Sequence, residues 1–100
     1  MPLLPPDAVA THLRRLDGWQ VVNRAIRKRF TFDTFLDGVR FVDRVAAIAE
    51  TADHHPDIDI RYKRVTMTLC THSEGGLTEK DFALAEQIER VADRRVTPPA

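Results

Sequence analysis

The sequence predicts an α+β domain in which three helices cover one face of a four-stranded antiparallel sheet, in the order α-β-β-α-β-β-α. The chain has 100 residues, 43% of them hydrophobic, which suffices for one compact domain and is too short for two. Two stretches alternate apolar and polar residues around a central turn, as hairpins do, and segments with helical spacing lie before, between and after them. Because adjacent hairpins favour an antiparallel sheet whose apolar face must be covered, we place the helices on that face.

The first helix is expected to begin after the prolines at positions 5 and 6, with Asp7 as its cap, and to stop at Gly18. Its apolar residues keep helical spacing at Val9, Leu13 and Leu16. Residues 19–32 then predict two strands around a turn at Asn23 and Arg24. The cationic residues of this hairpin alternate on its polar face, so we expect a solvated strand face and no nucleic-acid site.

The clearest helix is predicted from Asp33, as its N-cap, to about Glu50. Its predicted apolar face consists of Phe35, Val39, Val42, Ala46 and Ala49. A second hairpin follows, with alternating strands before and after a break near Lys63; Tyr62 is expected to pack its ring on the core, and Cys70 to be a small buried residue.

The last helix is predicted to begin at Thr78, because Asp81 three residues later completes a pair that resembles a capping box. Its apolar face consists of Leu84, Ile88 and Val91. Residues 1–100 thus form one domain, with ends at 1–5 and 96–100 that we expect to be flexible because prolines flank them.

Charge and composition exclude several classes of function. Fifteen Lys and Arg residues balance fifteen Asp and Glu residues, so no net field directs the chain toward nucleic acid or an anionic membrane. No apolar run is long enough to span a bilayer, and no secretory signal precedes the first helix. A single cysteine, Cys70, forms no internal disulfide. We therefore expect a soluble cytoplasmic protein.

Three of the four histidines, His54, His55 and His72, fall within 19 consecutive positions. Pro56 is the only proline away from the two ends of the chain, and it disfavours helical dihedral angles at His55. The preceding helix is therefore expected to end at about Asp53 or His54 and to release the histidine pair into a loop. His72 follows the second hairpin, where a side chain can leave the sheet and face a cleft.

Carboxylates accompany these histidines. Glu50 lies four residues before His54, so on a continuous helix its carboxylate can orient that imidazole. Asp53 offers a second acceptor, and Asp81 can face the same cleft. Alternatively, Asp81 only starts a helix and Glu50 lies on a solvated helix face. His12, outside the cluster, is expected to be solvated.

A zinc site is a further alternative, because histidine is the usual nitrogen ligand of zinc and a carboxylate could complete the set. Adjacent histidines form an awkward chelate, since neighbouring side chains in an extended chain point in opposite directions. We therefore expect no metal.

The combined spacing resembles the signature of the pterin-4a-carbinolamine dehydratase family. The matching residues are Glu50, His54, His55, Pro56, Tyr62, His72 and Asp81. The resemblance extends over about residues 3–93 and includes Gly18-Trp19, Phe30-x-Phe32 and the segment from Gly75 to Thr78. It implies a lyase that dehydrates 4a-hydroxytetrahydropterin to quinonoid dihydropterin in tetrahydropterin recycling, with no cofactor, as a homodimer or homotetramer.

By this resemblance His54, His55 and His72 are catalytic, and substrate-binding roles fall to Glu50, Asp53, Pro56 and Asp81. Imidazole suits the reaction because its ordinary pKa, ~6.5, lets it exchange protons near neutral pH. We favour His72 as the acid and His54 as the base, although the residues alone leave this assignment open. The alternative function is a non-catalytic binding or assembly module of the same fold, a role that some relatives have.

Overall fold

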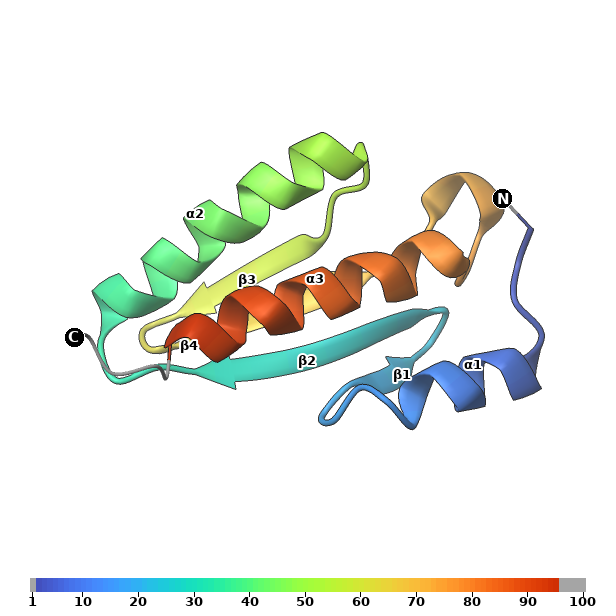
Figure 1. Cartoon of the computed structure of the whole chain (residues 1–100), viewed down its shortest axis with the longest axis horizontal. Coiled ribbons are helices and arrows are strands. Elements are labelled where there is room, and N and C mark those ends of the chain that lie inside the picture. The colour runs from blue at the N-terminus through green and yellow to red at the C-terminus, as the bar shows by residue number, and fades with distance from the viewer. Residues whose placement is uncertain (1, 96–100) are drawn as a thin grey trace.

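The computed structural model describes residues 2–95 and confirms the predicted order of elements (Figure 1). The elements are α1 (Pro6–Leu13), β1 (Gln20–Val22), β2 (Ala25–Thr31), α2 (Phe35–Ala52), β3 (Asp57–Arg61), β4 (Arg64–Leu69) and α3 (Glu79–Arg95). A 3₁₀ turn, η1 (His72–Glu74), lies between β4 and α3 and was not predicted. Of the two expected flexible ends, residues 96–100 lie outside the described residues.

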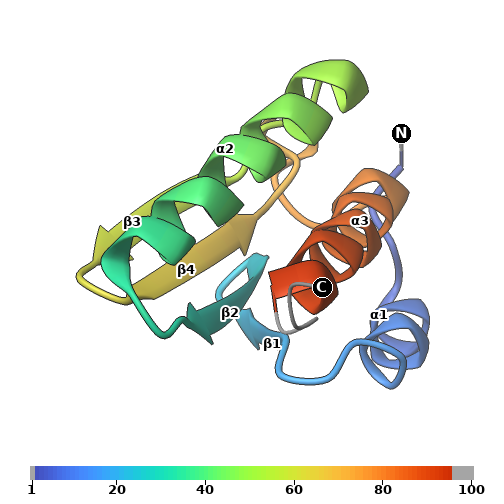
Figure 2. The same ribbon diagram turned by 60° about the vertical axis from the view of Figure 1, so that its left-hand side comes forward.

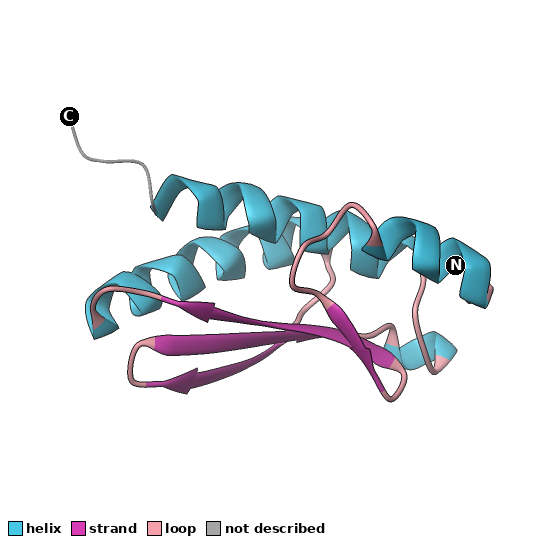
Figure 3. Cartoon of the chain, turned by 90° about the horizontal axis from the view of Figure 1, so that it is seen from below, coloured by secondary structure: helices cyan, strands magenta, loops and turns pink. Residues whose placement is uncertain are grey.

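The four strands form one antiparallel sheet in the order β1-β2-β4-β3. The long central pair sets the register, with Ile26 opposite Leu69 and Phe30 opposite Val65. These residues point to the covered face, because side chains of a strand alternate between the two faces of a sheet. Figure 3 shows α2 and α3 lying across that face, and Figure 2 shows α1 beside α3 on the same side. The predicted layer pair is therefore confirmed.

One apolar core joins the sheet to the helices. Phe41 of α2 packs between Phe30 and Phe32, with ring centroids 4.9 and 5.0 Å away. The buried residues of α2 are accordingly Gly38, Phe41, Val45 and Ala49. The predicted face was wrong by about one residue along the helix, since Phe35 and Ala46 are exposed. Aromatic contacts to the sheet, which periodicity does not reveal, set the rotation of α2.

The starts of α1 and α2 differ from the prediction. Pro5 is the N-cap of α1, so Asp7 lies in the first turn and does not cap it. The N-cap of α2 is Thr34, whose hydroxyl accepts from the backbone N–H of Asp37 at 3.0 Å, and not Asp33. In both cases the true cap lies within two residues of the predicted one. At α2 two adjacent polar residues, Asp33 and Thr34, could cap the same N–H groups, whereas α1 follows Pro5 without any side-chain cap.

His12 and Tyr62 also correct the sequence interpretation. His12 is partly buried and stacks on Phe82 of α3, with centroids 4.6 Å apart, so it fastens α1 to α3 and is not simply solvated. Tyr62 lies in the turn between β3 and β4 with φ +51°, and it is 69% exposed. A two-residue hairpin turn needs positive φ, so the Tyr62 ring leaves the sheet and does not reach the core.

Candidate active site

The end of α2 positions the histidine pair. Asp53 adopts a left-handed conformation, φ 52° and ψ 42°, directly after the last helical residue, Ala52. The backbone N–H of His54 then donates to the carbonyl of Ala49 at 3.1 Å, which closes the helix in a Schellman arrangement. Aspartate is one of the few residues besides glycine that tolerates this conformation. The helix thus ends four residues before Pro56, and Asp53 reverses the chain direction.

His54 pairs with a carboxylate from another part of the chain. Its Nε2 lies 2.6 Å from Oδ1 of Asp81, the third residue of α3. The His54 side chain is 10% exposed and that of Asp81 is fully buried. Glu50 was expected to orient His54 from one helical turn earlier, and this expectation was wrong, because the left-handed residue carries His54 away from the helix axis.

The second carboxylate oxygen of Asp81 also accepts hydrogen bonds. Oδ2 accepts from the backbone N–H of Thr78 and from the hydroxyl of Thr71, both at 2.9 Å. The hydroxyls of Thr71 and Thr78 lie 2.7 Å apart, and Oγ1 of Thr78 accepts from the N–H of Lys80 at 3.3 Å. The predicted capping box is therefore confirmed, and the same carboxylate that completes it also holds His54.

His55 pairs with Glu50 at the surface. Its Nε2 lies 2.6 Å from Oε1 of Glu50, and the two side chains are 55% and 78% exposed. The pair spans five positions, a spacing that no continuous helix favours, so it too depends on the left-handed turn at Asp53. The two adjacent histidines thus bind two different carboxylates, one buried and one solvated.

The remaining predicted residues lie around these pairs. His72 is the exposed first residue of η1, and it follows Thr71, the residue that binds Asp81. Pro56 joins His55 to β3 and is partly buried. The side chain of Asp53 is exposed and forms no hydrogen bond within the part of the chain that the structure describes. Its observed contribution is the turn itself.

Three residues of the site were not singled out as functional from the sequence. Thr71, which follows β4, donates a hydrogen bond to Asp81, and no local sequence pattern predicts this contact. Cys70 is partly buried beside the site, and burial, together with the charges of Asp81 and Asp57, raises the pKa of its thiol. Arg24 opposes this rise, and its charge therefore acts on the same end of the sheet.

Proton exchange is the chemistry that this arrangement supports best. Two imidazoles are each fixed by a carboxylate, and a third lies on the adjoining turn, so the site offers several groups that can give or take a proton. Among the described residues, no group of three His, Cys, Asp or Glu side chains is arranged to hold a metal ion. A neutral Cys70 thiol is a poor nucleophile.

Comparison with known proteins identifies the family. The sequence profile described as Pterin 4 alpha carbinolamine dehydratase matches residues 2–91. The chain belongs to this family. A protein of Mycobacterium sp. (strain KMS), provisionally named as a pterin-4-alpha-carbinolamine dehydratase, is 50% identical over 94 residues, which are 94% of this chain and all of that one. A similarly named protein of Mycobacteroides abscessus is 53% identical over 89 residues, or 89% of this chain and 95% of its own length.

Two solved structures of pterin dehydratase relatives have the same fold. One is described as a transcriptional coactivator/pterin dehydratase from Brucella melitensis; it superposes with a TM-score of 0.87 at 40% identity, over 90% of this chain and 98% of its own. The other is described as a pterin dehydratase-like protein that is a RuBisCO assembly factor in the alpha-carboxysome; its TM-score is 0.63 at 28% identity, over 74% of this chain and 86% of its own. The pterin dehydratase fold therefore occurs in proteins described by different functions.

Proposed function

We propose that this protein is a hydro-lyase that dehydrates 4a-hydroxytetrahydropterin to quinonoid dihydropterin. The observation that carries the proposal is the pair formed by His54 and the buried carboxylate of Asp81. Family membership supplies the substrate class, and the proposed reaction needs what the site contains, groups that move protons at neutral pH. In a cell, such an activity would regenerate the tetrahydropterin used by hydroxylases, in the cytoplasm.

The pairing with Asp81 assigns the proton on His54. Oδ2 of Asp81 already accepts two hydrogen bonds, and a carboxylate accepts but does not donate. The proton between Oδ1 and the imidazole therefore belongs to Nε2, so that in the neutral ring the lone pair is on Nδ1. A neutral histidine fixed in this tautomer is a general base, and Asp81 stabilises the imidazolium that forms when Nδ1 takes a proton.

The elimination requires one proton to be removed from the pterin ring and one to be delivered to the hydroxyl that leaves C4a as water. We assign the removal to Nδ1 of His54 and the delivery to His72, which is exposed on η1. His55, which pairs with Glu50 at the surface, is a second proton donor and acceptor next to His54. Asp53 and Pro56 shape the loop that presents both adjacent histidines. We propose that four residues contact or position the pterin: Glu50, Asp53, Pro56 and Asp81.

The test is the rate of loss of the 4a-hydroxypterin absorbance, measured by stopped flow with purified protein. His54→Ala and His72→Ala should each slow the catalysed reaction at least about tenfold, at the low end of what one positioned acid or base contributes. His12→Gln is the matched control, because it removes a histidine outside the site and should leave the rate unchanged. Unchanged rates in both site variants would overturn the assignment.

A non-catalytic assembly role is the second candidate. It is favoured by the likeness to the protein described as a RuBisCO assembly factor. The intact pairs of His54 with Asp81 and His55 with Glu50 support the enzyme instead, because an assembly surface has no need of a buried, oriented imidazole. A protein without dehydratase activity that binds a large partner through its surface would favour the assembly role.

We also propose that the chain forms a homodimer or homotetramer. Strand β3 is an edge strand that, among the described residues, pairs only with β4, and all five of its residues are exposed. Ile58 and Ile60 on this strand are 36% and 41% exposed, and Figures 1 and 2 show the start of α2, with exposed Phe35 and Leu36, beside the end of β3. Such an edge is commonly covered by pairing with a second chain. A monomeric mass by light scattering at micromolar concentration would contradict this.

A further inference from the structure

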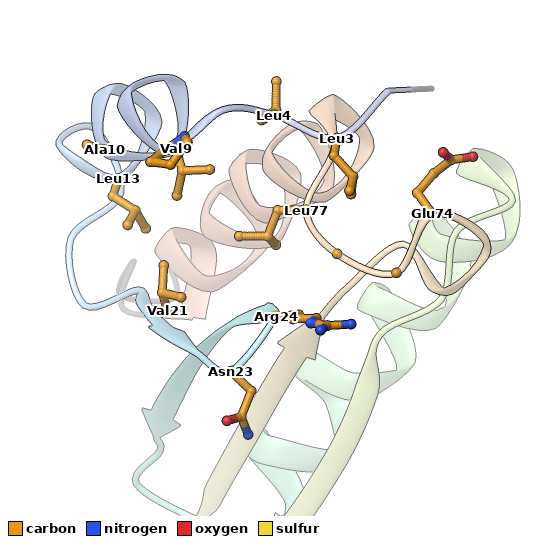
Figure 4. A pocket seen from close by; sticks show the side chains of 13 residues that line it. Leu3, Leu4, Val9, Ala10, Leu13, Val21, Asn23, Arg24, Glu74 and Leu77 are labelled. Carbon is orange, nitrogen blue, oxygen red and sulfur yellow. The ribbon is translucent and has the colours of Figure 1, made fainter.

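A cavity of about 840 Å³ lies between the N-terminal segment, α1 and the turn that joins β1 to β2 (Figure 4). None of the four histidines lines it, so it is separate from the candidate active site. Its volume is within the range of about 300–1,000 Å³ that is typical of small-molecule sites in proteins. The dehydratase reaction proposed above makes no use of it.

Most of the cavity wall is apolar. Its apolar side chains come from the N-terminal segment (Leu3, Leu4), from α1 (Val9, Ala10, Leu13), from β1 (Val21) and from the loop before α3 (Leu77). Two of them, Leu3 and Val21, are 52% and 47% exposed, although they lie on segments far apart in the sequence. Figure 4 shows the apolar side chains surrounding a common space. An apolar ligand in this space would remove both exposed side chains from water.

The N-terminal segment, which forms part of the cavity wall, contacts the loop before α3 at two points. The backbone N–H of Leu4 donates to the carbonyl of Leu77 at 2.9 Å. A Cβ added to Gly76 would lie 3.1 Å from the Cδ2 atom of Leu3, so the side chain of Leu3 lies close against this glycine. Two neighbouring contacts therefore hold the N-terminal segment against residues 76–77.

The opposite side of the cavity carries a cation. Arg24 and Asn23 lie on the turn between β1 and β2, below the apolar wall in Figure 4. Within the described part of the chain, Arg24 has no acidic partner at ion-pair distance. Glu74 also lines the cavity, and in Figure 4 its carboxylate is directed away from Arg24. The apolar wall and the guanidinium of Arg24 are therefore complementary to a ligand that has an apolar body and a single negative charge.

We propose that this cavity binds a small organic monoanion, a medium-chain carboxylate or a compound of the same chemistry, with its charge at Arg24 and its apolar body against α1. The ligand would also contact the turn that carries His72, because Gly75 and Gly76 line the cavity. That turn is closed by hydrogen bonds from Thr71 N–H to Gly76 O at 2.9 Å and from Gly75 N–H to His72 O at 3.1 Å. Binding should therefore also change the surroundings of His72, which these hydrogen bonds connect to the two glycines.

The experiment is a titration of ¹⁵N-labelled protein with octanoate and, separately, with octanol, followed by amide chemical shifts. Octanoate should shift the amides of Gly75 and Gly76 in a saturable, one-site manner. It should bind about two- to fivefold more tightly than octanol, the effect expected of one exposed ion pair. Arg24→Gln should abolish this difference, whereas the control Arg44→Gln, at an exposed position on α2, should preserve it.

Ala10→Trp tests the cavity itself, because Ala10 is an exposed residue of α1 that lines the space and an indole there would occupy the part of the cavity along α1. The variant should lose binding of both ligands while its circular dichroism stays that of the parent. The proposal is overturned by any of three results: no saturable octanoate shift up to about 10 mM, equal affinity for octanol and octanoate, or octanoate binding that survives in a folded Ala10→Trp protein. Should Ala10→Trp fail to fold, the Arg24→Gln comparison decides. None of these measurements depends on dehydratase activity.

Discussion

Replacing Asp81 by asparagine tests the assignment of His54 as the base with minimal change of shape. Oδ2 of Asp81 accepts from the N–H of Thr78, a backbone donor that cannot be reversed, and from the hydroxyl of Thr71. The carbonyl oxygen of the introduced amide must therefore take this position, which turns the NH₂ group toward Nε2 of His54. Because Nε2 must then accept, the imidazole proton moves to Nδ1, the nitrogen proposed to act as the base.

The expected loss of activity is about 100- to 10,000-fold, the range that a positioned general base contributes. The structural cost should be moderate. Three charge-assisted hydrogen bonds become neutral ones, at about 1 kcal/mol or less each, so we expect a loss of about 1–3 kcal/mol in the free energy of unfolding. For a domain of this size that lowers Tm by roughly 5–20 °C.

The assays are the dehydration rate, taken well below the variant's Tm, and the ¹⁵N chemical shifts of the His54 ring, which distinguish the two tautomers. Glu79→Gln is the matched control, because it removes another first-turn carboxylate of α3 that pairs with His12 and does not touch His54. A full dehydration rate in Asp81→Asn protein whose His54 has changed tautomer would refute the role of Nδ1. An unchanged tautomer would refute the assignment of the proton.

Three further outcomes are expected. Glu50→Gln should change the free energy of unfolding by less than about 1 kcal/mol in urea titration, because its pair with His55 is solvated; a larger loss would contradict the exposed geometry. Cys70→Ser should flatten the fall of Tm at alkaline pH. Because the pKa of the Cys70 thiol is raised in the folded protein, the thiol of the unfolded chain ionises first as the pH rises. The stability that the neutral thiol contributes is therefore present below the ordinary thiol pKa and is lost as the pH rises through the folded value. Equal slopes in parent and variant would count against this. Glu89→Gln should lower the free energy of unfolding by about 1–2 kcal/mol and alter the fluorescence of the single tryptophan, because Oε2 of Glu89 accepts from Trp19 Nε1 at 3.0 Å and from Lys28 Nζ at 2.8 Å; an unchanged emission spectrum would argue against that contact.

The fold was predictable because its signals are local. Alternation identified both hairpins, and the pair of Thr78 and Asp81 located the start of α3. The rotation of α2 was not predictable, since it depends on the contacts of Phe41 with two aromatic rings of the sheet region. Local periodicity gives the existence of an apolar face but fixes its direction only approximately.

The composition of the site was likewise easier to predict than its pairing. The sequence analysis named both adjacent histidines, Glu50 and Asp81, and the structure joins these four side chains in two pairs. Which carboxylate holds which imidazole depends on one left-handed residue, Asp53, and on the hydrogen bond of Thr71 to Asp81, which spans ten positions. A helical i, i+4 rule applied to Glu50 therefore selected the wrong histidine.

The two oxygens of Asp81 hold different parts of the chain, and this would make the proposed dehydratase activity a reporter of folding. Oδ2 fastens the first turn of α3 to the end of β4, while Oδ1 orients the imidazole that follows α2. An excised peptide from Glu50 to Asp81 would contain every proposed catalytic residue but not the rest of α3 or the strands that pair with β4. The proposed base, His54, is oriented only when α2, β4 and α3 have docked, so the dehydration rate in rising urea should decline together with the global unfolding transition and not before it.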